Sequence, residues 1–189
     1  MSVLVLAEVE VYPEYVDAEL MLFERLRTLY VSQPGCRSVR LLKHFDDPTR
    51  FALVTEWDAL EAPVAASRAW AESDLMAEAL QVVVGTPNLH THHIVDRLGN
   101  TLGSLEPGTV VVMIVAMAQP GMKVETMQRL EGITDSMVVA PGFLGAMTLD
   151  DAVIEERVAV VHLWQNYRSC RQYAAHFESY KHCVYELIM

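Results

Sequence analysis

A single spacing of 107 residues recurs along this chain and constrains its fold more than any other feature. It separates Trp57 from Trp164, and it also separates Pro34-Gly35 from Pro141-Gly142. The match needs no gap over about 80 residues, and apolar runs fall on apolar runs. Agreement of tryptophan, turn and strand residues at one shift indicates two copies of one folding unit.

The two copies define the expected domain organisation. We assign residues 1–98 to the first copy and residues 109–189 to the second. Residues 99–108 between them are rich in glycine, proline and other turn formers, which is typical of a linker. In a chain of 189 residues, each copy has the size of one small domain.

The first copy shows the order of elements most clearly. Alternating residues from Val3 to Val11 predict a strand, and apolar residues at helical spacing predict a helix that Pro34-Gly35 ends. The later elements are strands at 39–45 and 51–57, a helix at 59–83 and a strand at 90–95. This order, βαββαβ, is that of a ferredoxin-like unit, in which helices cover one face of an antiparallel sheet.

The expected fold class is α+β. A ferredoxin-like unit leaves one sheet face bare, yet these strands carry apolar residues on both faces. The other copy's sheet is the simplest cover for that face. We therefore expect two ferredoxin-like units whose antiparallel sheets pack face to face as an intramolecular dimeric α+β barrel.

The second copy ends early. Shifted by the same spacing, the fourth strand of the first copy would fall beyond Met189, so we expect the second unit to lack its final strand. An unpaired strand edge is a liability that proteins usually cover. We expect this edge either to admit a ligand or to be covered by a second chain in a homodimer.

Charge and composition exclude several classes of partner. A net charge of −11 repels a phosphate backbone and an anionic membrane surface, so we expect neither nucleic acid nor membrane as a partner. No apolar run approaches the roughly 20 residues that span a bilayer, and nothing reads as a signal peptide. Three widely spaced cysteines favour a reducing compartment, and we expect a cytoplasmic protein.

The residues leading to each tryptophan resemble the antibiotic biosynthesis monooxygenase (ABM) domain family. The matching stretches are PGCRSVRLLKHFDDPTRFALVTEW and PGFLGAMTLDDAVIEERVAVVHLW. The resemblance covers most of both copies and implies a dimeric α+β barrel of ferredoxin-like units. It also implies an enzyme that acts on a hydrophobic aromatic or polyketide-type small molecule. Because members include cofactor-independent monooxygenases that convert polycyclic phenols to quinones, we expect no cofactor.

Two family positions are filled differently in this chain. Quinone-forming members usually carry an asparagine four residues before this tryptophan, where the present residues are Leu53 and Val160. Haem-degrading relatives carry a histidine on the second helix, where the present residues are Met76 and Cys183, and we assign no haem. Two alternatives therefore stand: an enzyme that uses oxygen, and a non-oxidative cyclase or isomerase of the same superfamily.

The second copy carries the candidate site. A period of two places His162 and Trp164 on one face of its third strand. Five residues that follow have the spacing of a single helical stripe, which would face the sheet: Tyr173, His176, Phe177, Tyr180 and Val184. Because the first copy has mainly alanine at these positions, the two halves have diverged between helix and sheet. We predict a pocket there.

Each candidate residue has an expected role. His176 or His162 would be the general base, because a histidine pKa lies near neutral pH. The aromatic rings would stack on the substrate and orient it: Trp164, Tyr173, Tyr180, Phe177 and, in the first copy, Trp57. The alternative is that all of these are core side chains with satisfied hydrogen bonds, in a non-catalytic ligand-binding or structural pseudo-dimer.

Other polar residues give weaker indications of a functional site. His90 and His92 share a strand face at a spacing that can chelate a metal, but no third ligand is near in sequence, so we assign no metal. His93 is read with them as part of a strand-end polar cluster. Arg50 and Arg157 open the third strand of each copy, and we expect them to be solvated hairpin residues. No nucleotide-binding or hydrolase motif is present.

Overall fold

The computed structural model describes residues 1–189 and divides into two units. Unit 1 is Met1–Thr91 and unit 2 is His92–Met189. The boundary therefore falls inside a strand, ahead of the segment that we predicted to be the linker. That segment contains a short 3₁₀ turn, η2 (Leu102–Ser104), where the Thr101 and Ser104 side chains form a capping box.

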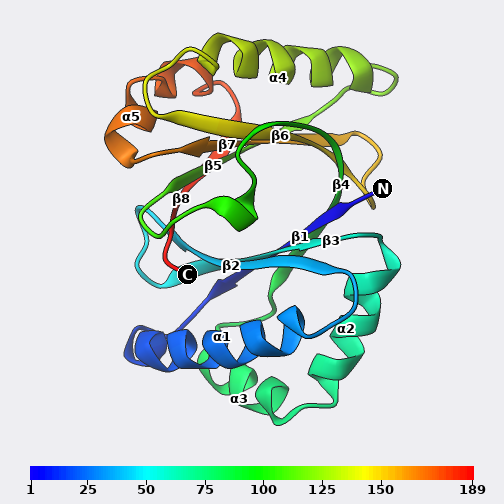
Figure 1. The fold of residues 1–189 in the computed structure, drawn as a ribbon, viewed down its shortest axis with the longest axis vertical. Coiled ribbons are helices and arrows are strands. Elements are labelled where there is room, and N and C mark those ends of the chain that lie inside the picture. Colours follow the sequence, from blue (N-terminus) through cyan, green and yellow to red (C-terminus); the bar gives the residue numbers. More distant parts are fainter. The chain divides into compact units, whose positions relative to one another are not determined.

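Unit 1 has the predicted order of elements. They are β1 (Val3–Glu10), the 3₁₀ turn η1 (Pro13–Tyr15), α1 (Val16–Val31), β2 (Cys36–His44), β3 (Arg50–Trp57), α2 (Glu61–Ala71), α3 (Asp74–Val82) and the first part of β4 (Asn88–Gly99). Strand β3 pairs antiparallel with both β1 and β2. Figure 1 shows the three helices of this unit on one side of these strands.

The predicted helix at 59–83 is in fact two helices. Helix α2 ends at Ala71 and α3 begins at Asp74. Ser73 separates them because its backbone is extended, and its hydroxyl donates to the Trp70 carbonyl oxygen at 2.6 Å. None of the helices in the structure combines the length and the apolar character that a membrane crossing requires.

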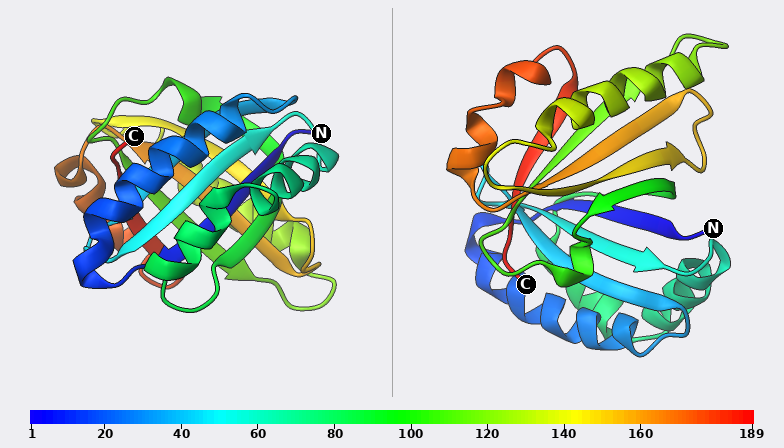
Figure 2. Two further views of the ribbon diagram at one scale, coloured as in Figure 1. Left: turned by 90° about the horizontal axis from the view of Figure 1, so that it is seen from below. Right: turned by 45° about the horizontal axis from the view of Figure 1, so that its top comes forward.

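Unit 2 repeats the order with one extra strand segment. Its elements are the second part of β4, then β5 (Val110–Met117), α4 (Lys123–Met137), β6 (Phe143–Asp151), β7 (Arg157–Trp164), α5 (Tyr167–Arg171), the 3₁₀ turn η3 (Ala174–His176) and β8 (Lys181–Leu187). The hydrogen-bonded strand order in this unit is β8-β5-β7-β6-β4, all antiparallel. Helix α4 covers one face of this sheet (Figures 1 and 2).

The prediction that the second unit lacks its final strand is wrong. Strand β8 pairs antiparallel with β5 from Val110↔Glu186 to Val115↔Lys181. The second unit keeps its final strand and has a shorter helical segment. Residues 165–180 connect its last two strands, whereas residues 58–87 connect the corresponding strands in unit 1. Backbone groups along β5 are thereby paired, which an open edge would leave unsatisfied. The reason for expecting a homodimer at that edge therefore disappears.

The predicted helical stripe at 173–184 is wrong for the same reason. Tyr173 precedes η3, and Tyr180 precedes β8. Val184 lies within β8, where buried Tyr185 and Leu187 alternate with exposed Glu186. A period of two near the end of the chain was therefore the stronger signal, because pairing with β5 fixes this segment as a strand.

The strand register recurs at the spacing found in the sequence. Val3 pairs with Trp57 in unit 1, and Val110 pairs with Trp164 in unit 2. The bulge between Cys36 and Ser38 recurs between Phe143 and Gly145. The fold class is the predicted one: α+β, with two ferredoxin-like units of the dimeric α+β barrel type.

Candidate active site

Strand β7 places two polar aromatic side chains beneath α4. Val158, Val160, His162 and Trp164 alternate onto one face of the strand, and all four are completely buried. They belong to the packed layer between α4 and the sheet, which also contains Leu130 and Met137 of α4. His162 and Trp164 are therefore neighbours on the helix-facing side of one strand.

The hydrogen bonds of His162 assign its tautomer. Its Nε2 lies 2.9 Å from the Thr134 hydroxyl oxygen of α4. That hydroxyl donates its only proton to the Leu130 carbonyl oxygen at 3.2 Å, so it accepts from His162. Nε2 therefore carries the ring proton, and Nδ1 carries a free lone pair.

His162 is neutral, and one of its nitrogens has no protein partner. Burial lowers the pKa of its imidazole to about 4, because desolvation disfavours the charged form. Its Nδ1 is buried and makes no hydrogen bond. A buried polar atom left unpaired costs about 1–3 kcal/mol. The ring is thus a buried hydrogen-bond acceptor whose acceptor atom is unused.

Trp164 adds an unpaired donor next to this acceptor. Its indole Nε1 is buried and makes no hydrogen bond. In unit 1, by contrast, Trp57 Nε1 donates to the Thr55 hydroxyl at 2.7 Å. Thr55 occupies the position of His162 at the spacing of 107 residues. The exchange of threonine for histidine therefore leaves unit 2 with two unpaired polar atoms where unit 1 has a satisfied pair.

Aromatic rings pack against these two side chains. Phe143 of β6 meets His162 edge-on at 5.7 Å and Trp164 edge-on at 5.2 Å between ring centroids. Tyr173 stacks on Trp164 at 5.4 Å with an angle of 24° between the rings. Both Phe143 and Tyr173 are partly exposed, so they form the outer wall of the cluster. We call these residues together with Thr134 the β7 aromatic cluster.

The structure separates the two predicted bases. His162 is at the centre of the β7 aromatic cluster, whereas His176 is exposed at the end of η3. The His176 ring contacts Tyr173 at 6.0 Å, and its Nδ1 lies 3.2 Å from the Tyr173 carbonyl oxygen. His176 is therefore a second neighbour of Tyr173 on the solvent side.

The other predicted aromatic residues have varied positions. Phe177 is buried in the same packed layer, with Tyr180 partly buried against it. Trp57 lies in unit 1, where it packs with Val3 and Ala66 and meets Tyr30 edge-on. Thr134 and Phe143 were missed by the sequence reasoning. Phe143 could have been found from the strand register, since it pairs directly with Trp164.

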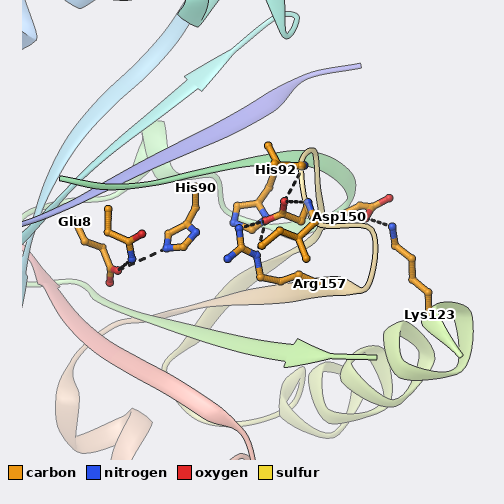
Figure 3. Close-up of polar contacts among 10 residues, drawn as sticks. Glu8, His90, His92, Lys123, Asp150 and Arg157 are labelled. Carbon is orange, nitrogen blue, oxygen red and sulfur yellow. Dashed lines mark hydrogen bonds and ion pairs between the residues drawn. The ribbon is translucent and has the colours of Figure 1, made fainter. Parts of the chain in front are cut away.

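A second polar group, at the hairpin between β6 and β7, corrects the expectation for Arg157. Asp151 has a side chain with no solvent exposure, and its Oδ2 accepts from Arg157 Nε and Nη2, both at 2.6 Å. Its Oδ1 accepts from the backbone N–H groups of Val153 and Ile154. His92 Nδ1 lies 3.5 Å from Oδ2 (Figure 3). Arg157 is thus a partly buried residue paired with a buried carboxylate, and not a solvated hairpin residue.

The predicted histidine cluster is divided between separate carboxylates. His92 faces Asp151, and His90 Nε2 lies 3.7 Å from Glu8 Oε2, which also accepts from the Asn88 amide (Figure 3). No group of three or more histidine, cysteine, aspartate or glutamate side chains in the structure is arranged to hold a metal ion.

Comparison with known proteins identifies the domain. The family model described as antibiotic biosynthesis monooxygenase matches residues 2–81. No curated protein sequence matches the chain. A solved structure of a proposed monooxygenase from Fusobacterium nucleatum is similar to the whole chain, with a TM-score of 0.79 at 13% identity over 100% of this chain and 93% of that one.

Two further solved structures share the fold. A proposed monooxygenase from Lactobacillus acidophilus gives a TM-score of 0.70 at 8% identity, covering 99% of this chain and 93% of that one. An anthrone oxidase-like protein gives 0.70 at 13% identity, covering 100% and 92%. At these identities the likeness concerns the fold. The family match shows an antibiotic biosynthesis monooxygenase domain at residues 2–81, and the solved structures share the fold of the whole chain.

Proposed function

We propose that unit 2 binds an oxygen-bearing aromatic molecule at the β7 aromatic cluster and oxidises it with molecular oxygen as a cofactor-independent monooxygenase. The observation that supports this is the pair of buried, unpaired atoms His162 Nδ1 and Trp164 Nε1. Unpaired buried polar groups in a native protein call for an explanation, and a ligand is one such explanation. Unit 1, in which the equivalent indole is satisfied, lacks this feature.

The chemistry of the two atoms fits a phenol that carries a second oxygen. A hydroxyl would donate to His162 Nδ1, and another oxygen of the ligand would accept from the indole N–H of Trp164. Side chains two residues apart on a strand are separated by roughly 6–7 Å, which suits two oxygens on one fused ring system. The ligand's ring would displace Tyr173, which is partly exposed, and stack on Trp164 in its place.

His162 would act as the general base. With a pKa of about 4 in the unliganded core, it is neutral and ready to accept a proton at neutral pH. Proton transfer from a phenol would create an imidazolium beside a phenolate, and this attraction would raise the imidazole pKa toward that of its partner. The phenolate is electron-rich enough to reduce oxygen. For an anthrone, one oxygen atom enters the ring methylene carbon as a carbonyl and the other leaves as water.

A second candidate function is a non-oxidative cyclase or isomerase. The observation in its favour is Val160, a fully buried aliphatic residue where quinone-forming family members usually carry asparagine. Such an enzyme would use the same base and the same aromatic walls, and oxygen would not enter the reaction.

The test uses dithranol, a trihydroxyanthracene tautomer, as the probe. We expect the protein to bind it and to form the quinone with uptake of one oxygen molecule per turnover, measured with an oxygen electrode against an enzyme-free control. In His162→Gln the amide reaches Thr134 but leaves nothing at the Nδ1 position, so both affinity and turnover should fall, turnover by about 10²–10⁴-fold. In His162→Asn an oxygen remains near the Nδ1 position, so binding should persist while turnover is lost.

Thr55→Val is the matched control in unit 1. It replaces the hydroxyl at the position equivalent to His162 with a methyl group, and turnover should stay at the wild-type value. Binding of dithranol without oxygen uptake would favour the non-oxidative candidate. Full turnover in His162→Gln, or no binding of dithranol by the wild-type protein, would contradict the proposal.

A further inference from the structure

Two arginines on one turn of α5 line a solvent-open hollow. Its volume is about 440 Å³, and it is lined by Tyr167, Arg168, Arg171 and Gln172. A volume of this size is within the range of small-molecule sites, which is roughly 300–1,000 Å³. All four residues are consecutive or nearly so, and therefore a single short segment of unit 2 forms the hollow.

Neither arginine has an acidic partner. Two other exposed arginines do have one, in the pairs Arg25–Glu78 and Arg37–Asp58, whereas Arg68 and Arg129 have none. Arg168 and Arg171 make no ion pair, although the chain has 25 acidic residues against 14 basic ones. Two like charges three residues apart on a helix repel each other. An anion between them would replace this repulsion with two attractions.

The remaining walls define the rest of the ligand. Tyr167 is partly buried against the core of unit 2 and gives the hollow an aromatic side. Gln172 supplies an amide that can donate or accept. Guanidinium groups bind planar carboxylates through paired, charge-assisted hydrogen bonds, and they also stack on flat rings. We propose that this hollow is a binding site for a small aromatic carboxylate, held by Arg168 and Arg171 with its ring against Tyr167.

This site is separate from the reaction assigned to the β7 aromatic cluster. None of its four lining residues contacts His162 through any hydrogen bond or ring contact found in the structure. Binding in the hollow should therefore survive in His162→Gln. Failure of one proposal leaves the other in place.

The probe is 2-naphthoate, titrated by its fluorescence at low ionic strength. We expect saturable 1:1 binding that weakens at least tenfold in Arg168→Gln and in Arg171→Gln, and that weakens as salt is added. Arg129→Gln is the matched control, because Arg129 is exposed on α4, makes no ion pair and does not line the hollow. It should bind 2-naphthoate like the wild-type protein.

Three outcomes would overturn the assignment. Equal weakening in Arg129→Gln would show that only the overall charge matters. Equal affinity for the neutral analogue 2-naphthalenemethanol would show that the carboxylate is not recognised. Displacement of 2-naphthoate by the same concentration of inorganic phosphate would show that the hollow takes any anion and does not select an aromatic carboxylate.

Discussion

Asp151→Ala should destabilise the protein by about 3–5 kcal/mol. The substitution leaves the Arg157 guanidinium without its carboxylate, and it also removes the acceptor for the N–H groups of Val153 and Ile154. The loss should exceed that of an ordinary ion pair, because the Asp151 side chain is fully buried. Urea unfolding followed by circular dichroism at pH 7 measures it directly.

The neighbouring residue provides the control. Asp150 also forms an ion pair, with Lys123, but both side chains are about 30% exposed. Asp150→Ala should therefore cost less than about 1 kcal/mol. Asp151→Asn should fall between the two, because its amide oxygen can still accept from the hairpin N–H groups. A change of less than 1 kcal/mol in Asp151→Ala would refute the assignment of a buried ion pair.

Acid adds a further check on Asp151. Burial alone would raise the pKa of its carboxyl, but the hydrogen bonds from Ile154, Val153 and Arg157, with the nearby His92, together lower it below its usual value of 3.8. A depressed carboxyl pKa means that the stabilisation is present above about pH 4 and is lost as the pH falls through the folded-state value. The gap between wild type and Asp151→Ala should therefore close only in strong acid.

Stability should fall by about 3 kcal/mol between pH 6.5 and pH 4 because of His162. The pKa of its imidazole drops from 6.5 in the unfolded chain to about 4 in the folded protein. Between these pH values the His162 imidazole is protonated in the unfolded chain but neutral in the folded protein. Unfolding therefore becomes more favourable as the pH falls. Well above pH 6.5 both states are neutral and His162 makes no pH-dependent contribution.

Two glutamine variants isolate this effect. His162→Gln removes the titrating group while its amide can still reach Thr134, so its stability should change much less between pH 6.5 and pH 4. His176→Gln removes an exposed histidine, and its profile should follow the wild type. Parallel profiles for wild type and His162→Gln across this range would show that His162 is not held neutral by burial.

The parts of the fold that local residues determine were predictable. Pro34-Gly35 and Pro141-Gly142 end a helix in each unit, and both glycines have positive φ angles, 81° and 83°, that other residues rarely adopt. The shared 107-residue spacing carried this information from one unit to the other. The strand register around Trp57 recurs around Trp164 because register depends on the same alternation of side chains in both units.

The parts that long-range pairing determines were not predictable. The aromatic residues at 173–184 have a helical spacing. Pairing with β5 nevertheless makes the last part of this segment a strand. The hydrogen-bond partner of His162 could not be predicted from the sequence for a similar reason. Thr134 lies on a helix 28 residues earlier, and only the packing of α4 on the sheet brings the hydroxyl to the ring.

The candidate site was partly predictable as well. Sequence comparison of the two units located the divergence between helix and sheet, and period two placed His162 beside Trp164. It could not distinguish His162 from His176 as the base, because burial is a property of the folded core. The decisive contrast, His162 in place of Thr55, was visible in the sequence only as one difference among many.

Nitrogen-15 NMR of the histidine side chains, recorded with and without dithranol under argon, tests the central claim most directly. The histidine resonances that are missing from the spectrum of His162→Gln are those of the His162 ring. We predict a neutral ring with its proton on Nε2 at pH 6, and a shift of the bare Nδ1 resonance toward the protonated position when dithranol binds. A ring with its proton on Nδ1, or an Nδ1 resonance that saturating dithranol leaves unmoved, would contradict the account.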